Sequence, residues 1–532
     1  MTQVWRGYMT SRKLPIGIQS FEKIITNNYI YIDKTRYIYD LVHSGSQFFL
    51  SRPRRFGKSL LLSTLKEYWK GNKELFSGLQ IDKLEQGNSD AWQRYPVFYF
   101  DFNGQNYQNK NALENILDEH LTGWEKEYGC NDYDSKTLEE RFRDLLKKAY
   151  TINGLRSVVL VDEYDKPLLE TENKPELEEY NKAVFKGFFG SLKGMDDYLQ
   201  FVFVTGVTKF SKVSIFSDLN QLNDISMDTD YNEICGMTER EIIDNFPYEL
   251  KKLEDKIGIS NEACLEKLKH SYDGYHFSSE GAGIYNPYSV LCALQKGKFG
   301  YYWFETGTPS FLVSKLKQMD FDVAQFSNLK LYATEKRLSD YRGDNPDIVP
   351  LLYQTGYLTL KKYDSQAEYY ALGFPNDEVK YGFLDSLLPE YTPAVNTVTG
   401  KDIISILQYV KNGDIDNIRD AFIALFAGIT YTSSDVPYEH YFQTVIYLVF
   451  TLLGQYVKCE VHSYTGRADC VTETDRFVYI FEFKKDSTAK EALEQIQNQN
   501  YAKPYISDKR KVLKIGVNFD SESKELTEWI VE

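Results

Sequence analysis

A short run of residues near the N-terminus has the composition of a phosphate-binding loop. The run from Arg52 to Ser59 reads Arg-Pro-Arg-Arg-Phe-Gly-Lys-Ser, between the apolar stretch 48–50 and a predicted helix over 60–70. Main-chain N–H groups of such a loop and the N-terminus of the next helix bind phosphate, and the lysine reaches the terminal phosphates. The residues expected to contact a nucleotide are Arg54, Arg55, Phe56, Gly57, Lys58, Ser59 and Leu60.

Ser59 is expected to hold Mg²⁺ as well. The loop departs from the pattern G-x-x-x-x-G-K-[ST], because Arg52 stands where the first glycine is usual. Taken alone, Gly57-Lys58-Ser59 is also compatible with an ordinary helix start. Arg54 and Arg55 leave three alternatives open: contact with phosphate in the same chain, contact with a neighbour's nucleotide, or electrostatic support of the loop.

Two carboxylates at the end of an apolar run support the nucleotide interpretation. The segment Ser157-Val-Val-Leu-Val-Asp162-Glu163 is typical of a buried parallel strand. Ligands of open α/β sheets bind beyond the carboxyl ends of the strands, so this pair and the loop are expected at one edge. We predict that Asp162 contacts Mg²⁺ and that Glu163 is the base that orients the attacking water.

A third apolar run, 200–205, ends in Thr205, whose hydroxyl is expected to sense the γ-phosphate. Threonine is also ordinary in strands, so the structural alternative remains open. Asp165 follows the acidic pair, and its two predicted roles are to arrange a Mg²⁺-bound water or to cap the next helix.

A second group of chemically capable residues lies near the C-terminus. Asp469 precedes a predicted strand, and the next strand ends in Glu482-Phe483-Lys484. Two carboxylates at one fork, completed by the Phe483 carbonyl, can bind Mg²⁺, and Lys484 returns to the face of Glu482. The metal would activate a nucleophile, and the lysine would stabilise the phosphate transition state. A charged β-hairpin without chemistry is the alternative, and Glu439 is a further candidate ligand.

The motifs together resemble a known family. The runs 31–35, 49–59, 161–167 and 205–210, with the helix–strand–Asp–strand–Glu-x-Lys–helix order near the C-terminus, are similar to bacterial AAA-ATPase-like proteins that carry a PD-(D/E)XK nuclease-like domain. An Arg-Pro-Arg-Arg-Phe-Gly-Lys-Ser loop is typical of that family. The resemblance implies an archaeal or STAND-like P-loop ATPase, the cofactors ATP and Mg²⁺, and accessory positions at Gln495 and Tyr501.

Composition limits the remaining classes. The chain has 532 residues, 42% hydrophobic and 26% charged, which predicts a globular protein of several domains. No apolar run approaches the length that spans a bilayer, so we expect no membrane association. Six cysteines without C-x-x-C spacing indicate a reducing cytoplasm. The net charge of −15 excludes a surface that is basic throughout, so any DNA contact must be local, and the lysine-rich stretch 484–514 is the candidate.

Alternating strands and helices predict an α/β protein with a P-loop parallel sheet. The expected strands are 47–51, 96–102, 157–162, 200–205 and 222–227. We predict four parts: an AAA-like P-loop domain over 1–230, a helical lid over 231–297, a winged-helix-like module over 298–395 and a PD-(D/E)XK nuclease-like α/β domain over 396–532.

These features lead to one main hypothesis and an alternative. The main hypothesis is an ATP-hydrolysing switch joined to a Mg²⁺-dependent nuclease that cuts DNA, with self-association expected by analogy. The alternative is a nucleotide-gated scaffold or regulator whose last domain only binds nucleic acid or protein. A GTP-using switch is disfavoured, because no N-K-x-D loop is present.

Overall fold

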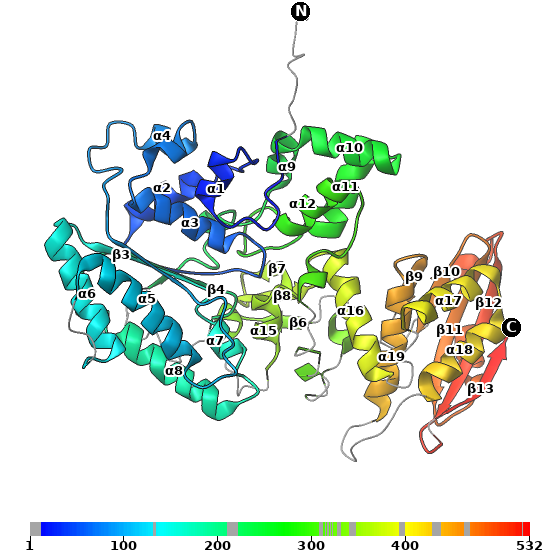
Figure 1. Cartoon of the computed structure of the whole chain (residues 1–532). Helices are drawn as coiled ribbons and strands as arrows, with labels where there is room; N and C mark the ends of the chain where they lie inside the picture. The colour runs from blue at the N-terminus through cyan, green and yellow to red at the C-terminus, as the bar shows by residue number, and fades with distance from the viewer. Residues whose placement is uncertain are drawn as a thin grey trace, which may run out of the picture. The chain divides into compact units, whose positions relative to one another are not determined.

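The computed structural model describes most of the chain. The described residues are 12–130, 135–209, 222–307, 312–313, 315–316, 319, 321, 323–326, 331–339, 347–392, 399–427, 438–461, 469–523 and 525–532, without the side chains of 324, 399–402, 427 and 438–443. The chain divides into two compact units (Figure 1). The first contains Met1–Trp303 and Tyr332–Asp377, and the second contains Phe304–Leu331 and Glu378–Glu532.

A parallel sheet forms the centre of the first unit. Its strands are β1 (Gln47–Ser51), β2 (Val97–Asp101), β3 (Ser157–Asp162), β4 (Leu199–Gly206) and β5 (Asn223–Asp224), in the order β2-β3-β4-β1-β5. All four expected long strands are confirmed, and β5 is shorter than expected. Every residue of β3 is buried, which explains its continuous apolar sequence, because both faces of a parallel sheet are covered.

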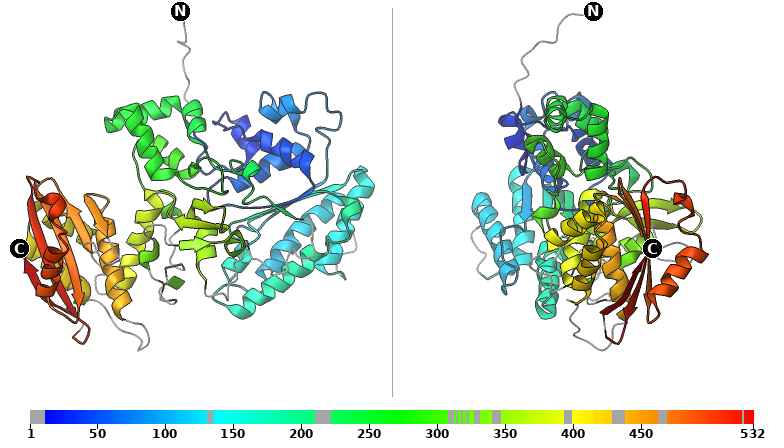
Figure 2. Two further views of the ribbon diagram at one scale, coloured as in Figure 1. Left: turned by 180° about the vertical axis from the view of Figure 1, so that it is seen from behind. Right: turned by 90° about the vertical axis from the view of Figure 1, so that its right-hand side faces the viewer.

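Helices cover the two faces of this sheet (Figures 1 and 2). One face carries α1 (Phe21–Thr26), α2 (Thr35–Ser44), α3 (Lys58–Trp69) and α4 (Gln80–Leu84). The other carries α5 (Ala112–Tyr128), α6 (Leu138–Asn153) and α8 (Pro175–Gly190), and the short helix α7 (Lys166–Leu169) follows β3. Phe188 of α8 stacks on Phe142 of α6 at 5.0 Å between ring centroids, and both rings are fully buried. Phe188 also lies 5.5 Å from Phe100 of β2 between ring centroids, so aromatic packing joins this helical layer to the sheet.

The rest of the first unit is helical, with a small sheet. The helices predicted over 236–297 are present as α9 (Glu239–Asn245), α10 (Pro247–Ile257), α11 (Asn261–Tyr272) and α12 (Pro287–Lys296). Thr238 and Glu241 form the predicted capping box of α9. Next come β6 (Leu331–Ala333), α14 (Glu335–Leu338), α15 (Val349–Gln354), β7 (Thr359–Asp364) and β8 (Tyr369–Gly373), which confirm the helix–turn–strand expected around 351–360. Their identity as a lid and a winged helix stays a prediction.

The second unit contains a mixed sheet of order β13-β12-β11-β10-β9. Its strands are β9 (Lys458–Val461), β10 (Cys470–Glu473), β11 (Phe477–Lys485), β12 (Lys511–Asp520) and β13 (Glu525–Val531), and only the β11–β12 pair is parallel. Helices α17 (Thr399–Asn412), α18 (Ile415–Ala427) and α19 (Tyr438–Leu453) lie on one side, and α20 (Ala489–Asn498) lies on the other (Figure 2). Helix α16 (Asp377–Tyr391) precedes them.

The predicted order of helix, strand, Asp, strand, Glu-x-Lys and helix is therefore present in the second unit. The boundaries of the four predicted parts stay predictions, since the two compact units do not separate at 230, 297 or 395.

We predict that truncating the aromatic layer destabilises the first unit. Phe188→Ala removes a fully buried ring that packs on Phe142 and Phe100, and the resulting cavity should cost about 3–5 kcal/mol of unfolding free energy. Denaturant unfolding measures this change. Ile152→Ala is the control, because that side chain is 57% exposed and its loss should have little effect. Equal stability of the two variants would contradict the assignment of this core.

Candidate functional site

The loop between β1 and α3 has the backbone of a phosphate cradle. Arg55 (φ 67°) and Gly57 (φ 100°) are left-handed, a conformation that turns successive N–H groups toward one concavity. Gly57 is the N-cap of α3, and no side chain caps this described helix, so the N–H groups of its first turn are open to an anion. A methyl group built on Gly57 would meet no atom within 4 Å, so the space beside this residue is open.

Lys58 lies inside this loop. Its side chain is buried, and Nζ donates hydrogen bonds to the carbonyl oxygens of Arg52 (2.9 Å) and Pro53 (3.1 Å). Burial lowers the pKa of Lys58, and the nearby charges of Glu163 and Asp162 oppose that shift. A lysine held in this way is positioned at the centre of the predicted phosphate site.

Other parts of the first unit hold the outer side of the loop. Phe56 is buried 4.8 Å from the Tyr275 ring centroid, and its carbonyl accepts a hydrogen bond from the amide of Gly236. The carbonyl of Arg54 accepts from Trp303 Nε1 at 2.9 Å. The side chains of Arg54 and Arg55 are exposed. In this segment, the groups left to make the predicted phosphate contacts are the main chain and two exposed guanidinium groups.

Asp162 lies at the carboxyl end of β3 between two hydroxyl donors. Thr205 donates to Oδ1 at 2.8 Å, and Tyr99 of β2 donates to Oδ2 at 3.2 Å. Both Asp162 and Thr205 are buried. A carboxylate fixed from both sides keeps one orientation and has lone pairs left for a cation, which fits the predicted Mg²⁺ role. The Thr205 hydroxyl is directed at Asp162, so its predicted phosphate contact remains a prediction.

Glu163 follows Asp162 in a left-handed backbone conformation (φ 51°). Such a conformation costs energy for a residue with a side chain, and it often occurs at functional sites. Burial raises the pKa of Glu163, while the positive charge of Lys58 opposes the shift. A carboxylate with a raised pKa beside the phosphate loop is suited to general-base chemistry.

Asp165 is the N-cap residue of α7, but its side chain bonds elsewhere, and its predicted role with a Mg²⁺-bound water stays a prediction. Its carboxylate accepts hydrogen bonds from the amides of Val207 and Thr208 and from the Thr208 hydroxyl at 2.7 Å. The Asp165 side chain makes no cap bond to α7 within the described structure, and only its main-chain carbonyl accepts from the amides of that helix. Asp165 therefore anchors the turn that follows β4.

Tyr99 was missed in the sequence, because a tyrosine in an apolar strand is indistinguishable from a core residue, although its position two residues before Asp101 places it near the edge of the sheet.

The C-terminal constellation is assembled in the second unit. Cys470 of β10 pairs with Phe481 of β11, so Asp469 lies one step beyond this pair, beside Glu482. Asp469 Oδ2 accepts a hydrogen bond from the amide of Phe483 at 2.8 Å. The predicted fork between paired strands is thus present.

Glu482 is 2% exposed, and its Oε2 atom is buried without a hydrogen-bond partner among the described residues. Lys484 Nζ lies 3.3 Å from Oε1 and also donates to the side-chain oxygen of Gln495, whose side-chain nitrogen donates to the Tyr501 hydroxyl. Burial, together with the charge of Asp469, raises the pKa of Glu482 to about 7. A buried carboxylate oxygen without a donor beside a second carboxylate fits a divalent cation.

Three observations concern the further ligands of this cation site. Among the described residues no group of three or more His, Cys, Asp or Glu side chains could hold a metal, so within this part of the chain the other ligands would be main-chain oxygen and water. The role of the Phe483 carbonyl stays a prediction. The Glu439 side chain lies outside the described ones.

The positive charge of the basic stretch 484–514 is less available for contact with DNA than the sequence indicates. Arg510 pairs with Asp508 and Glu473, Lys514 with Glu532, and Lys490 with Glu494. Intramolecular carboxylates thus neutralise much of this charge.

None of the helices that the structure describes has the length and apolar character needed to cross a membrane.

Comparison with known proteins agrees with this geometry. Residues 15–216 match the AAA-ATPase-like family, described as predicted AAA-ATPases, and residues 437–529 match the PD-(D/E)XK nuclease superfamily. A protein of Azotobacter chroococcum, described as an uncharacterized protein in the vnfD 5′ region, is 35% identical over 98% of this chain and 99% of its own length. The chain belongs to the AAA-ATPase-like family with a C-terminal PD-(D/E)XK nuclease-like domain. In this AAA-ATPase-like chain the two matched regions contain the two sites described above.

We predict that the proton on Glu482 makes stability depend on pH. The pKa of Glu482 is about 7 in the folded chain and near 4.5 when unfolded, so its neutral form contributes stability below pH 4.5. That contribution is lost as the pH rises through 7. In EDTA, the Tm of the second unit should therefore fall more between pH 5 and pH 8 in the wild type than in Glu482→Gln. Mn²⁺ at pH 8 should raise the Tm of the wild type alone. Parallel pH curves would contradict this prediction.

Proposed function

We propose that this chain binds and hydrolyses ATP with Mg²⁺, and that its second unit is a metal-dependent nuclease that cleaves DNA phosphodiesters. The observation that supports the ATPase most strongly is the convergence of Lys58, Asp162 and Glu163 at one edge of the sheet. The electrostatic influence of both carboxylates on Lys58 indicates that the three side chains share one site. The family match supports both activities at the level of class.

At the nucleotide site each residue has a distinct proposed task. The loop amides and Lys58 bind and orient the phosphates, and the left-handed Arg55 and Gly57 make this possible. Ser59 and Asp162 would hold the magnesium ion, which screens the phosphate charge when bound. Glu163 would accept the proton of the attacking water, since its raised pKa suits a base.

At the second site Asp469 and Glu482 would hold the cation, which supplies a metal-activated water when bound. Lys484 is oriented by Gln495 and Glu482, so that its ammonium can neutralise charge that develops on a phosphate. Nucleotide-dependent control of this site is part of the proposal.

A second candidate function is a nucleotide-gated regulator whose last domain binds without cutting. The ion pairs of Arg510, Lys514 and Lys490 favour it, because they reduce the positive charge available to DNA. We also propose a cytoplasmic location, which is supported by six cysteines without disulfides. Assembly into homo-oligomers stays a prediction, with Arg54 and Arg55 as exposed loop residues that could reach a neighbour.

We predict that Lys58→Ala lowers ATP turnover at least about 100-fold, because it removes the ammonium that stabilises transferred phosphate. Release of inorganic phosphate from ATP and Mg²⁺ measures this. Lys70→Ala is a matched control, since Lys70 is an exposed lysine just beyond the other end of α3. Glu163→Gln should keep ATP affinity and lose turnover. Unchanged turnover in both Lys58→Ala and Glu163→Gln would reject the ATPase proposal.

We also predict that Asp469→Asn lowers plasmid nicking at least about 100-fold, because the variant loses one of two cation ligands. Agarose electrophoresis of supercoiled DNA with Mn²⁺, with and without ATP, follows the reaction. Asp475→Asn is the control, an exposed aspartate in the turn between β10 and β11. If the wild type binds Mn²⁺ and DNA but never nicks, the regulator function replaces the nuclease.

A further inference from the structure

Arg52 occupies the position at which phosphate loops usually have their first glycine, and its side chain points inward. It is 1% exposed and among the largest fully buried side chains of the chain. It therefore cannot serve as a phosphate ligand in this conformation, unlike the exposed Arg54 and Arg55. A buried guanidinium is costly unless its donors are satisfied, so its contacts indicate what it does.

The hydrogen bonds of Arg52 end on main-chain carbonyls. Nη1 donates to Ser226 (2.6 Å) and to Ser51 (3.0 Å), and Nη2 donates to Tyr231 (3.1 Å). The guanidinium carbon lies 4.0 Å from the centroid of the Phe277 ring, a cation–π geometry. Arg52 thus joins the end of β1 to the segment after β5 and to the aromatic turn that packs on Phe56.

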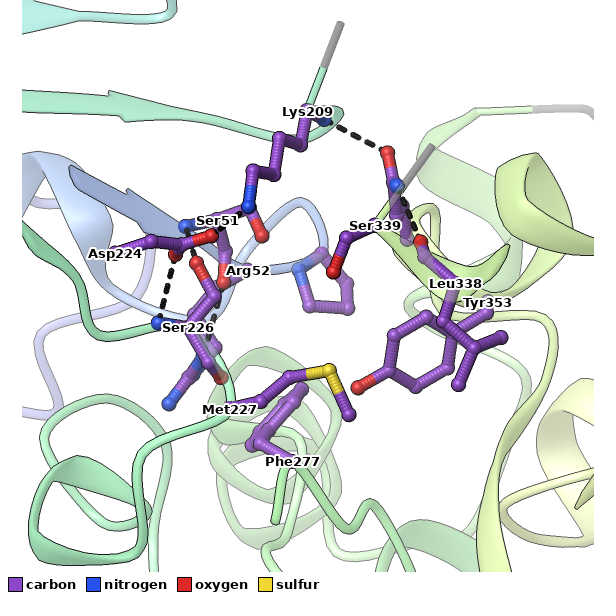
Figure 3. A pocket seen from close by; sticks show the side chains of 12 residues that line it. Ser51, Arg52, Lys209, Asp224, Ser226, Met227, Phe277, Leu338, Ser339 and Tyr353 are labelled. Atoms are coloured by element: carbon purple, nitrogen blue, oxygen red, sulfur yellow. Dashed lines mark hydrogen bonds and ion pairs between the residues drawn. The ribbon is translucent and has the colours of Figure 1, made fainter. Parts of the chain in front are cut away.

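A polar network extends this anchor to the end of β4 (Figure 3). The amide of Ser51 donates to Ser226 Oγ, the amide of Ser226 donates to Asp224, and Asp224 forms an ion pair with Lys209. The amide of Lys209 donates to the side chain of Gln354 at 2.7 Å. These bonds therefore connect the segment that follows Thr205 to the first turn of the loop and hold both in place.

The cavity next to this polar network has a volume of about 20 Å³. Tyr353 and Leu338 form part of the wall opposite the network (Figure 3). That volume is sufficient for one water molecule and not for a nucleotide or metabolite. The polar groups here therefore act on the loop rather than on a second ligand.

Lys58, the loop residue proposed to bind phosphate, depends on Arg52 for its position. Lys58 Nζ is held by the carbonyl oxygens of Arg52 and Pro53, and the amide of Arg52 donates to Gly206. The position of the Arg52 carbonyl is fixed by its neighbours on both sides. A glycine at 52 would remove a donor from each of these three carbonyls, of which that of Tyr231 keeps the amide of Ile234, and would free the backbone of the turn that holds Lys58.

We propose that Arg52 is a positioning residue for Lys58: its buried guanidinium fixes the first turn of the phosphate loop from inside, in place of the usual glycine. The inference rests on the proposed ATP site. It implies that restoring the usual glycine at this position weakens nucleotide binding instead of improving it.

The test uses the full chain with Arg52→Gly and Arg52→Lys, and with Arg337→Met as the control. Arg337 pairs with Asp347 in the same compact unit, so its loss tests for a general effect of removing an ion-paired arginine. Binding of a fluorescent ATP analogue without Mg²⁺ measures affinity separately from turnover. Amine-reactive labelling followed by peptide mass spectrometry measures access to Lys58 relative to the other lysines.

We expect Arg52→Gly to weaken analogue binding about tenfold or more and to raise labelling of Lys58 selectively. Arg52→Lys keeps the charge and should lie between this variant and the wild type, and Arg337→Met should match the wild type. Should Arg52→Gly fail to fold, Arg52→Lys alone decides through the same two measurements. Wild-type affinity and Lys58 labelling in the folded variants would overturn the inference. Failure of the ATP site itself is distinguishable, because the wild type would then not bind the analogue.

Discussion

Parallel pairing of β1, β3 and β4 is the constraint on which the proposed nucleotide site depends. The register places Leu50 beside Thr205 and Val161 beside Val204, so that three loops leave the sheet at the same edge. The segment after β1 carries the lysine, the end of β3 carries the acidic pair, and the end of β4 carries the hydroxyl. Since β3 and β4 are buried along almost their whole length, slippage would expose apolar side chains, and the edge is held in place by the core of the first unit.

The polar groups at that edge are satisfied to different degrees, and the difference has chemical meaning. Asp162 and Asp165 each accept hydrogen bonds on both oxygens from neighbouring elements. These bonds offset the cost of burying them and fix their orientation. Glu482 in the second unit is equally buried but has an oxygen without a donor. A carboxylate in that state either keeps its proton or binds a cation, which is how one side chain can respond to both pH and metal.

Much of the architecture could be inferred from periodicity and spacing. The strands of the first sheet and the order around Asp469 and Glu482 follow from apolar runs with polar ends, because burial selects those patterns directly. The contributions of Tyr99 and Arg52 could not be inferred. A tyrosine in a strand has the same pattern whether its hydroxyl is free or bonded, and an arginine in a phosphate loop suggests an anion ligand unless its direction is known.

The residue types of the two candidate sites, a lysine with an acidic pair and a Glu-x-Lys with a distant aspartate, are readable along the chain because each separate motif is short. Folding decided which partners these groups have. The inward turn of Arg52, the two hydroxyls on Asp162, the anchoring role of Asp165 and the ion pairs of the C-terminal lysines all join residues that are brought together by packing. The free energy of burying a polar group is set by such neighbours, and therefore only the tertiary structure determines whether a charged residue faces a ligand or stabilises the fold.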